Sequence, residues 1–95
     1  MTRKELIYRL CNEHNEQTIK LLHDFPTLLR DLWIMEDYEE ALRLYQQKKI
    51  HAKKQWTRDL VVERYGIGVN TFYEIQKRVE WVLTNLDKAL SARNR

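Results

Sequence analysis

The amino-acid sequence predicts an all-α fold, a single small domain of about four helices spanning residues 1–95. Only two glycines and one proline are present, which leaves little of the turn chemistry that β-strands require. Apolar residues recur three and four positions apart through most of the chain, which is the spacing of one helical face. A chain of 95 residues is long enough for one modest core and too short for two domains.

The first helical pattern begins at Thr2, which fits a capping box with Glu5 three residues on. A polar stretch at residues 12–17 interrupts the pattern. We expect one helix with a weak middle, two helices being the alternative. Cys11 is the only cysteine and can form no intrachain disulfide, so we expect it to be a small core residue. The apolar positions around the polar stretch are Leu6, Ile7, Leu10, Cys11, Ile19, Leu21 and Leu22.

A second helix is predicted to start at Pro26, since proline is favoured in the first turn of a helix and disfavoured in its interior. Its apolar stripe is Leu28, Leu32, Met35, Tyr38, Leu42 and Tyr45. The acidic residues within 36–40 are expected to form a solvated face rather than an acid–base or metal site. Cys11 and His14 lie three positions apart, but the chain lacks the further ligands of a closed zinc site, so no metal or cofactor is predicted.

Two more helical patterns meet at a short turn within residues 57–78. The apolar positions are Leu60, Val61 and Tyr65 before the turn and Phe72, Ile75 and Val79 after it. Gly66 follows the last periodic residue of the first helix, so we expect it to end that helix in the left-handed conformation. Asn70 is expected to be the N-cap of the second helix. Thr57 is expected to cap the first, with Trp56 as an apolar staple before it.

The last predicted helix continues well beyond the turn. Apolar positions recur as far as Leu90, which predicts a helix of about 22 residues. Trp81 lies off this stripe, and an exposed tryptophan there would indicate a partner surface. The residues predicted to be buried are Leu28, Leu32, Leu42, Leu60, Val61, Ile67, Phe72, Ile75, Val79, Leu83 and Leu86.

The turn region carries a recognisable pattern, with Tyr65-Gly66-Ile67 at the turn, Thr71-Phe72-Tyr73 after it and Ile75 two positions on. This run resembles the helix-turn-helix superfamily, in particular the DNA-binding segments of resolvases, transposases, small phage regulators and phage terminase small subunits. The resemblance implies a helix-turn-helix at about residues 57–78, double-stranded DNA as the partner, and a phage or mobile-element role such as transcription regulation. Val69 and Glu74 depart from the pattern, in which polar or basic residues are common at these positions.

Charge is distributed unevenly along the chain, whose formal net charge is +3. Residues 1–47 hold six Lys/Arg against nine Asp/Glu, a net charge of −3, whereas residues 48–95 hold eleven against five, a net charge of +6. The basic half contains the turn and the four lysines of residues 48–54, as expected for contact with a polyanion. The alternative is that the two oppositely charged halves attract each other, with lysine stems covering apolar surface.

We therefore expect a small DNA-binding protein without catalytic activity, which reads the major groove with residues 70–78 and holds phosphates with residues 48–58. The predicted phosphate contacts are Lys48, Lys49, Lys53, Lys54, Arg58 and Arg78. The predicted base-edge contacts are Asn70, Thr71, Tyr73, Glu74 and Lys77. One copy of the motif reads few base pairs, so a homodimer or higher homo-oligomer is expected. No membrane or small-molecule substrate is predicted as a partner.

The alternative function is a helical protein–protein interaction or assembly module that retains the helix-turn-helix fold without binding DNA. Val69 and Glu74 favour it, and an exposed apolar patch over Val69, Tyr73 and Trp81 would support it. An enzyme is not predicted, because the sequence shows no catalytic Ser-His-Asp or Cys-His set, no glycine-rich phosphate loop and no metal-ligand spacing. No charged-then-apolar leader or long apolar run is present, so a cytoplasmic protein is expected.

Overall fold

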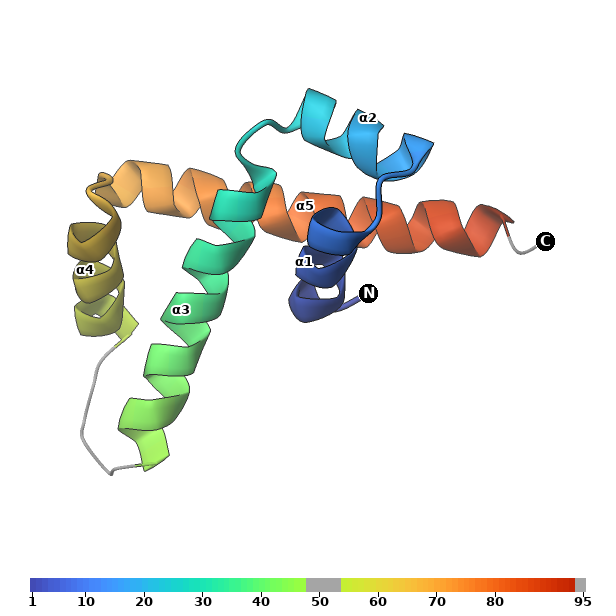
Figure 1. Cartoon of the computed structure of the whole chain (residues 1–95). Coiled ribbons are helices and arrows are strands. Elements are labelled where there is room, and N and C mark those ends of the chain that lie inside the picture. The colour runs from blue at the N-terminus through green and yellow to red at the C-terminus, as the bar shows by residue number, and fades with distance from the viewer. Residues whose placement is uncertain (48–53, 94–95) are drawn as a thin grey trace.

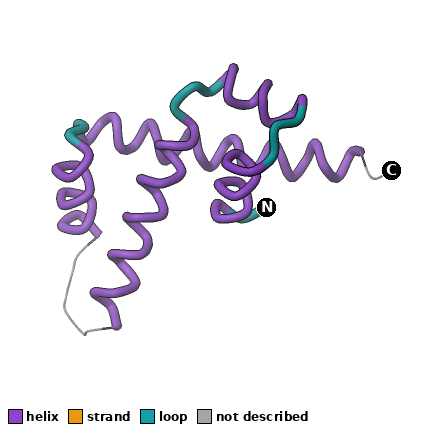
Figure 2. The backbone as a smooth tube through the Cα atoms, viewed as in Figure 1, coloured by secondary structure: helices purple, strands orange, loops and turns teal. Residues whose placement is uncertain are grey.

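The computed structural model of the chain describes residues 1–47 and 54–93, which form five α-helices and no strand (Figure 1). The helices are α1 (Arg3–Asn12), α2 (Glu16–Asp24), α3 (Leu28–Gln47), α4 (Lys54–Tyr65) and α5 (Val69–Arg93). Short loops join α1 to α2, α2 to α3 and α4 to α5 (Figure 2). The predicted all-α fold is therefore confirmed, with one helix more than expected.

The additional helix arises because the polar stretch near the N-terminus is a true helix boundary. Asn15 is the N-cap of α2: its side chain accepts a hydrogen bond from the Thr18 backbone N–H at 3.0 Å, and the Thr18 hydroxyl accepts from the Asn15 N–H at 3.1 Å. In a continuous helix the backbone N–H groups of Asn15 and Thr18 would instead donate to backbone carbonyls four positions earlier. The expectation of one continuous helix is wrong. The predicted cap at Thr2 is confirmed, since its hydroxyl accepts from the Glu5 N–H at 3.1 Å.

Helix α3 lies at the centre of the fold. It packs against α1, α4 and α5, and in Figure 1 it runs between α4 and α1 while α5 extends behind them along the molecule. The rings of Tyr38 on α3 and Phe72 on α5 meet edge-on, with their centroids 5.1 Å apart. The buried apolar residues are Leu6, Ile7, Leu10, Leu28, Leu32, Ile34, Met35, Tyr38, Val61, Phe72, Ile75, Val79 and Val82.

Most of the predicted core is observed. Leu28, Leu32, Val61, Phe72, Ile75 and Val79 are buried, and Leu42, Ile67, Leu83 and Leu86 are partly buried against them. The prediction is wrong for Leu60, whose side chain is 38% exposed. It is also wrong for Cys11, which is exposed. Leu60 immediately precedes the buried Val61, and Cys11 immediately follows the buried Leu10. One position along a helix is a rotation of about 100°, so both side chains point away from the core.

The connection between α4 and α5 is a Schellman motif. Gly66 has φ of +64°, its N–H donates to the Glu63 carbonyl at 3.2 Å, and the Ile67 N–H donates to the Val62 carbonyl at 3.1 Å. The predicted left-handed end of α4 at Gly66 is therefore confirmed. These bonds satisfy carbonyls in the last turn of α4, and only three residues separate the end of α4 from the start of α5.

The predicted caps on either side of this connection are wrong. Helix α5 begins one residue before Asn70, which lies exposed within its first turn. Helix α4 begins at Lys54, ahead of the predicted cap, because the residues there are good helix formers. Thr57 is consequently buried inside α4, and Trp56 is 45% exposed with its ring edge-on to Tyr45 at 4.8 Å.

Substituting Gly66 tests whether glycine is required at this position only because of its backbone conformation. A Cβ at Gly66 would meet no atom within 4 Å, so Gly66→Ala adds no clash and only places a Cβ at positive φ. We expect the free energy of unfolding to fall by about 1–2 kcal/mol. Gly66→Asn is the matched control, because asparagine tolerates this conformation and should cost clearly less. Urea denaturation compares the two variants, and equal losses would contradict the explanation.

Candidate functional site

The first turns of α5 expose a polar face on the side opposite the core. Phe72, Ile75 and Val79 of this helix are buried, and most of the positions between Val69 and Arg78 that are not buried are exposed to solvent. The exposed residues include all five predicted base-edge contacts, namely Asn70, Thr71, Tyr73, Glu74 and Lys77. Asn70, Tyr73, Glu74 and Lys77 are spaced three, one and three positions apart, so they lie on one face. We call these four residues and Thr71 the α5 surface.

One member of the α5 surface is tied to α4. The Arg58 Nη1 donates to the Tyr73 hydroxyl at 2.6 Å, and the Arg58 guanidinium carbon lies 5.7 Å from the centroid of the Tyr73 ring. Arg58 Nε and Nη2 donate to Asp59 Oδ1 at 3.1 and 2.9 Å. The Arg58 side chain is only 16% exposed, whereas Tyr73 is 43% exposed. Two residues that were predicted to contact different parts of DNA therefore form one unit across the corner.

Arg78 is tied to α3 by hydrogen bonds, although its side chain is 36% exposed. Its Nη1 donates to Asp31 Oδ2 at 2.8 Å and to the Thr27 hydroxyl at 3.3 Å. The Asp31 side chain is fully buried at the start of α3, where it also accepts from the Thr27 hydroxyl at 3.0 Å and from Arg30 Nη2 at 3.3 Å. The charge of Arg78 is thus already compensated by a buried carboxylate, and the ion pair joins α5 to α3. Sequence spacing gave no indication of this pair, because its members lie 47 positions apart.

The acidic residues of α3 have partners on other helices. Arg3 of α1 donates to Glu36 at 2.8 Å and to Glu39 at 2.9 Å, and the side chain of Glu36 is only 17% exposed. The Tyr65 hydroxyl of α4 donates to Asp37. Burial, together with this hydrogen bond, raises the pKa of Tyr65. The prediction of a purely solvated face is wrong for Glu36 and Asp37, which help to attach α1 and α4 to α3.

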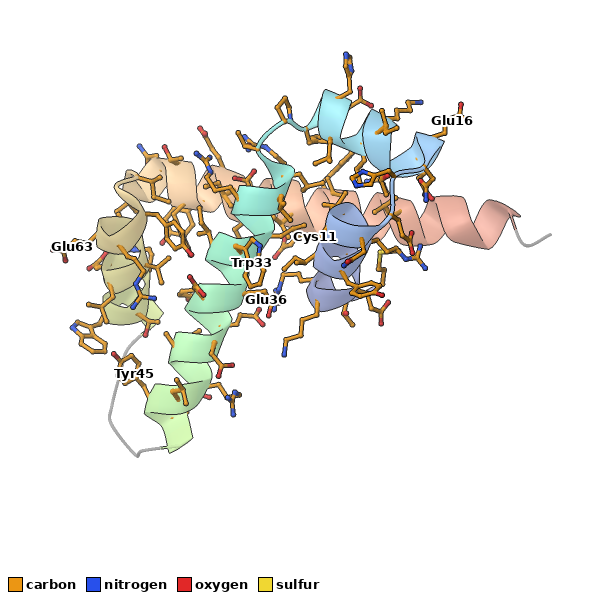
Figure 3. The ribbon with its side chains drawn as sticks, viewed as in Figure 1. Cys11, Glu16, Trp33, Glu36, Tyr45 and Glu63 are labelled. Carbon is orange, nitrogen blue, oxygen red and sulfur yellow. The ribbon has the colours of Figure 1, made fainter. Side chains whose placement is uncertain are left out.

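The predicted lysine contacts fall largely outside the described residues. Lys48, Lys49 and Lys53 lie within residues 48–53, and Lys54 is the first residue of α4. Near the corner, the exposed charges that the structure describes are of both signs. They are Asp59, Glu63, Arg64, Glu74 and Lys77, and Figure 3 shows Glu63 pointing outward from α4. These five residues carry two positive and three negative charges, so they supply no excess of positive charge.

Two exposed tryptophans lie on other parts of the surface, and sequence reasoning had considered only Trp81 as a partner surface. Trp81 is 57% exposed on α5, and its ring lies 5.7 Å from that of Phe25, which follows α2. Trp33 of α3 is 49% exposed and lines a groove with Tyr8 and Cys11 of α1 (Figure 3).

No protein-family model, curated protein or solved structure matches the chain. The resemblance to helix-turn-helix proteins therefore stays a prediction. Within residues 1–47 and 54–93, no group of three or more His, Cys, Asp or Glu side chains is arranged to hold a metal ion. Over the same residues, no helix combines the length and the apolar character needed to cross a lipid bilayer.

The Asp31–Arg78 pair can be tested by its effect on stability. Arg78→Ala leaves a fully buried carboxylate with only Thr27 and Arg30 as partners, so the free energy of unfolding should fall by about 2–3 kcal/mol. Lys77→Ala removes a cation from the neighbouring exposed position and should change it by less than about 0.5 kcal/mol. Urea denaturation followed by circular dichroism measures both. Similar values for the two variants would show that the pair does not hold α5.

Proposed function

We propose that the chain binds double-stranded DNA through a helix-turn-helix made of α4, the turn at Gly66 and α5, with the first turns of α5 in the major groove. The observation that carries the proposal is the α5 surface, a polar helical face directly after a tight corner. Figure 1 places this corner at one end of the molecule, while α1 and α2 lie further along α5. A helix presented in this way has the dimensions that the major groove admits.

Each exposed residue of the α5 surface has a defined chemistry toward base edges. Asn70 can donate to and accept from adenine, Glu74 can accept from the amino group of cytosine, and Lys77 can donate to guanine. Lys77 lies about 10 Å along the helix axis from Asn70, which is about the span of three base pairs. A second copy is needed for a longer site, so we propose a homodimer that places two α5 helices about 34 Å apart.

The phosphate contacts in this proposal come from α4 and the segment before it. Lys48, Lys49, Lys53 and Lys54 bring four positive charges within seven residues, immediately before or at the start of α4. Helix α4 would then cross the DNA backbone, as the first helix of such a motif does. We assign Arg78 to holding α5 on Asp31 in place of the phosphate contact expected from the sequence, since its guanidinium already bonds a buried carboxylate.

A second candidate function is a protein interaction or assembly module. Val69, Tyr73 and Trp81 are 37%, 43% and 57% exposed on α5, and exposed apolar side chains of this size support a protein partner. Glu74 adds a charge that DNA phosphates repel. DNA binding is preferred because Lys77 lies between Tyr73 and Trp81 on the helix surface and the chain carries the four lysines of residues 48–54.

Salt dependence separates the two functions. Each phosphate neutralised by a cation releases a condensed counterion, so log Kd for a labelled random-sequence duplex should change with log salt at a slope of magnitude about 4–5 per protomer. Fluorescence anisotropy at several salt concentrations measures the slope. The assembly module would be favoured by two results together. The protein would not bind the duplex at low salt, and it would self-associate in sedimentation velocity experiments unless it carried Trp81→Ser.

Lys77→Ala and Lys53→Ala should weaken DNA binding in different ways. Lys77 is exposed on the α5 surface, so its loss should cost about 1–3 kcal/mol on a duplex selected from a random pool and little on a scrambled duplex. Lys53, from the basic run, should weaken both duplexes alike and reduce the salt slope by about one. Equal losses on both duplexes for Lys77→Ala would mean that α5 does not read sequence through this residue.

A further inference from the structure

The hydrogen bond between Arg58 and Tyr73 restricts what the tyrosine hydroxyl can do. A phenol oxygen has one proton to donate and lone pairs to accept with, and here Arg58 Nη1 donates to that oxygen at 2.6 Å. Because arginine can only donate, the proton of Tyr73 is not used in this bond. The hydroxyl is therefore left as a donor, and the ligand atom that it suits best is an acceptor.

The positive charge of Arg58 favours an anionic acceptor for the hydrogen bond from the Tyr73 hydroxyl. Of its five N–H groups, three are used by Tyr73 and Asp59, which leaves two that these bonds do not use. The guanidinium charge beside the phenol also strengthens the phenol as a donor, since a donor bonded to a cation is polarised. A neutral base edge gains little from this charge, whereas a phosphate oxygen accepts from both groups.

The position of the pair agrees with a backbone contact. Tyr73 belongs to α5, but its hydroxyl is held by a residue of α4, so it lies at the junction of the two helices rather than at the outermost point of α5. In the docking proposed above, α4 crosses the DNA backbone while α5 enters the groove. The side chain of Arg58 is only 16% exposed and is fixed by Asp59, so the pair is ordered before a ligand arrives.

We infer that Arg58 and Tyr73 form one binding site for a backbone phosphate of DNA, so that Tyr73 positions the protein on the duplex and does not read a base. This inference rests on the proposed DNA binding. It reassigns Tyr73, which the sequence placed among the base-edge contacts, and it joins that residue to the phosphate contact predicted at Arg58. Base reading is then left to Asn70, Thr71, Glu74 and Lys77.

Tyr73→Phe tests the inference, because it removes only the hydroxyl from a partly exposed ring. Loss of one charge-assisted hydrogen bond should weaken binding about five- to tenfold, and equally on a selected duplex and on a scrambled duplex. The salt slope should stay unchanged, since a neutral hydroxyl displaces no counterion. Tyr8→Phe is the matched control: this tyrosine is 64% exposed on α1, and its variant should bind like the wild type. Fluorescence anisotropy at matched salt provides all four comparisons.

A second variant tests whether the two residues act together. In an Arg58→Gln background, Tyr73→Phe should weaken binding less than twofold, because the hydroxyl has lost the cation that holds and polarises it. Circular dichroism melting confirms that both backgrounds are folded. A loss confined to the selected duplex, an equal loss in both backgrounds or no loss at all would overturn the phosphate site while leaving DNA binding intact. Failure of the wild type to bind either duplex would overturn both proposals.

Discussion

The buried carboxylate of Asp31 is the constraint on which the placement of α5 depends. A carboxylate removed from water is tolerated only when donors surround it, because its desolvation is otherwise unfavourable by several kcal/mol. Thr27 and Arg30 are its neighbours in sequence, but the closest cation is Arg78 at 2.8 Å, which lies on another helix. Apolar contacts alone are non-directional, whereas a charged hydrogen bond requires one register of α5 on α3. The same bond therefore fixes which side of α5 faces outward.

Helix α4 is attached at both ends by bonds of the same directional kind. Near its C-terminus, the Tyr65 hydroxyl donates to Asp37 of α3, and the Schellman motif at Gly66 sets the direction in which the chain leaves. Nearer its N-terminus, Arg58 donates to Tyr73 of α5. A helix held to both of its neighbours cannot rotate without breaking one of these bonds. The α5 surface is consequently part of a rigid arrangement, which is a requirement for recognising the shape of a groove.

The parts of this structure that sequence predicts are those governed by local chemistry. Helical periodicity predicted the buried residues of α3 and α5, and glycine at the end of a periodic segment predicted the left-handed residue Gly66. The outward positions of α5 followed from the same periodicity. The break before α2 was missed because a polar stretch has the same composition whether it ends a helix or continues it. Only the bond between Asn15 and Thr18 decides between the two.

The polar partners of the candidate site were beyond sequence reasoning for a different reason. Arg78 and Arg58 are arginines in a basic segment next to a predicted DNA-binding helix, so charge alone assigns both to phosphate. Their actual partners depend on how α3, α4 and α5 pack, and no spacing rule connects residues 15 or 47 positions apart. Composition gives the number of cations in a segment, but packing determines which of them are free to meet a ligand.

The charges on the α5 surface imply that, in the proposed complex, selectivity and affinity come from different parts of the chain. Lys77 is offset by Glu74 three positions away, so this surface gains little from the general attraction of a cation to DNA. The carboxylate of Glu74 is repelled by the phosphates of every duplex. This repulsion is compensated only where a base donates a hydrogen bond to the carboxylate, so Glu74 favours selectivity over affinity. In the proposed DNA complex, affinity would come from the four lysines of residues 48–54 and from a second copy. That copy cannot use the α5 surface, because one face cannot contact DNA and protein together. Trp81 follows Lys77 by four positions and so lies on the same side of α5, whereas the exposed Trp33 of α3, beside α1, lies away from the α5 surface and stays accessible in the proposed complex.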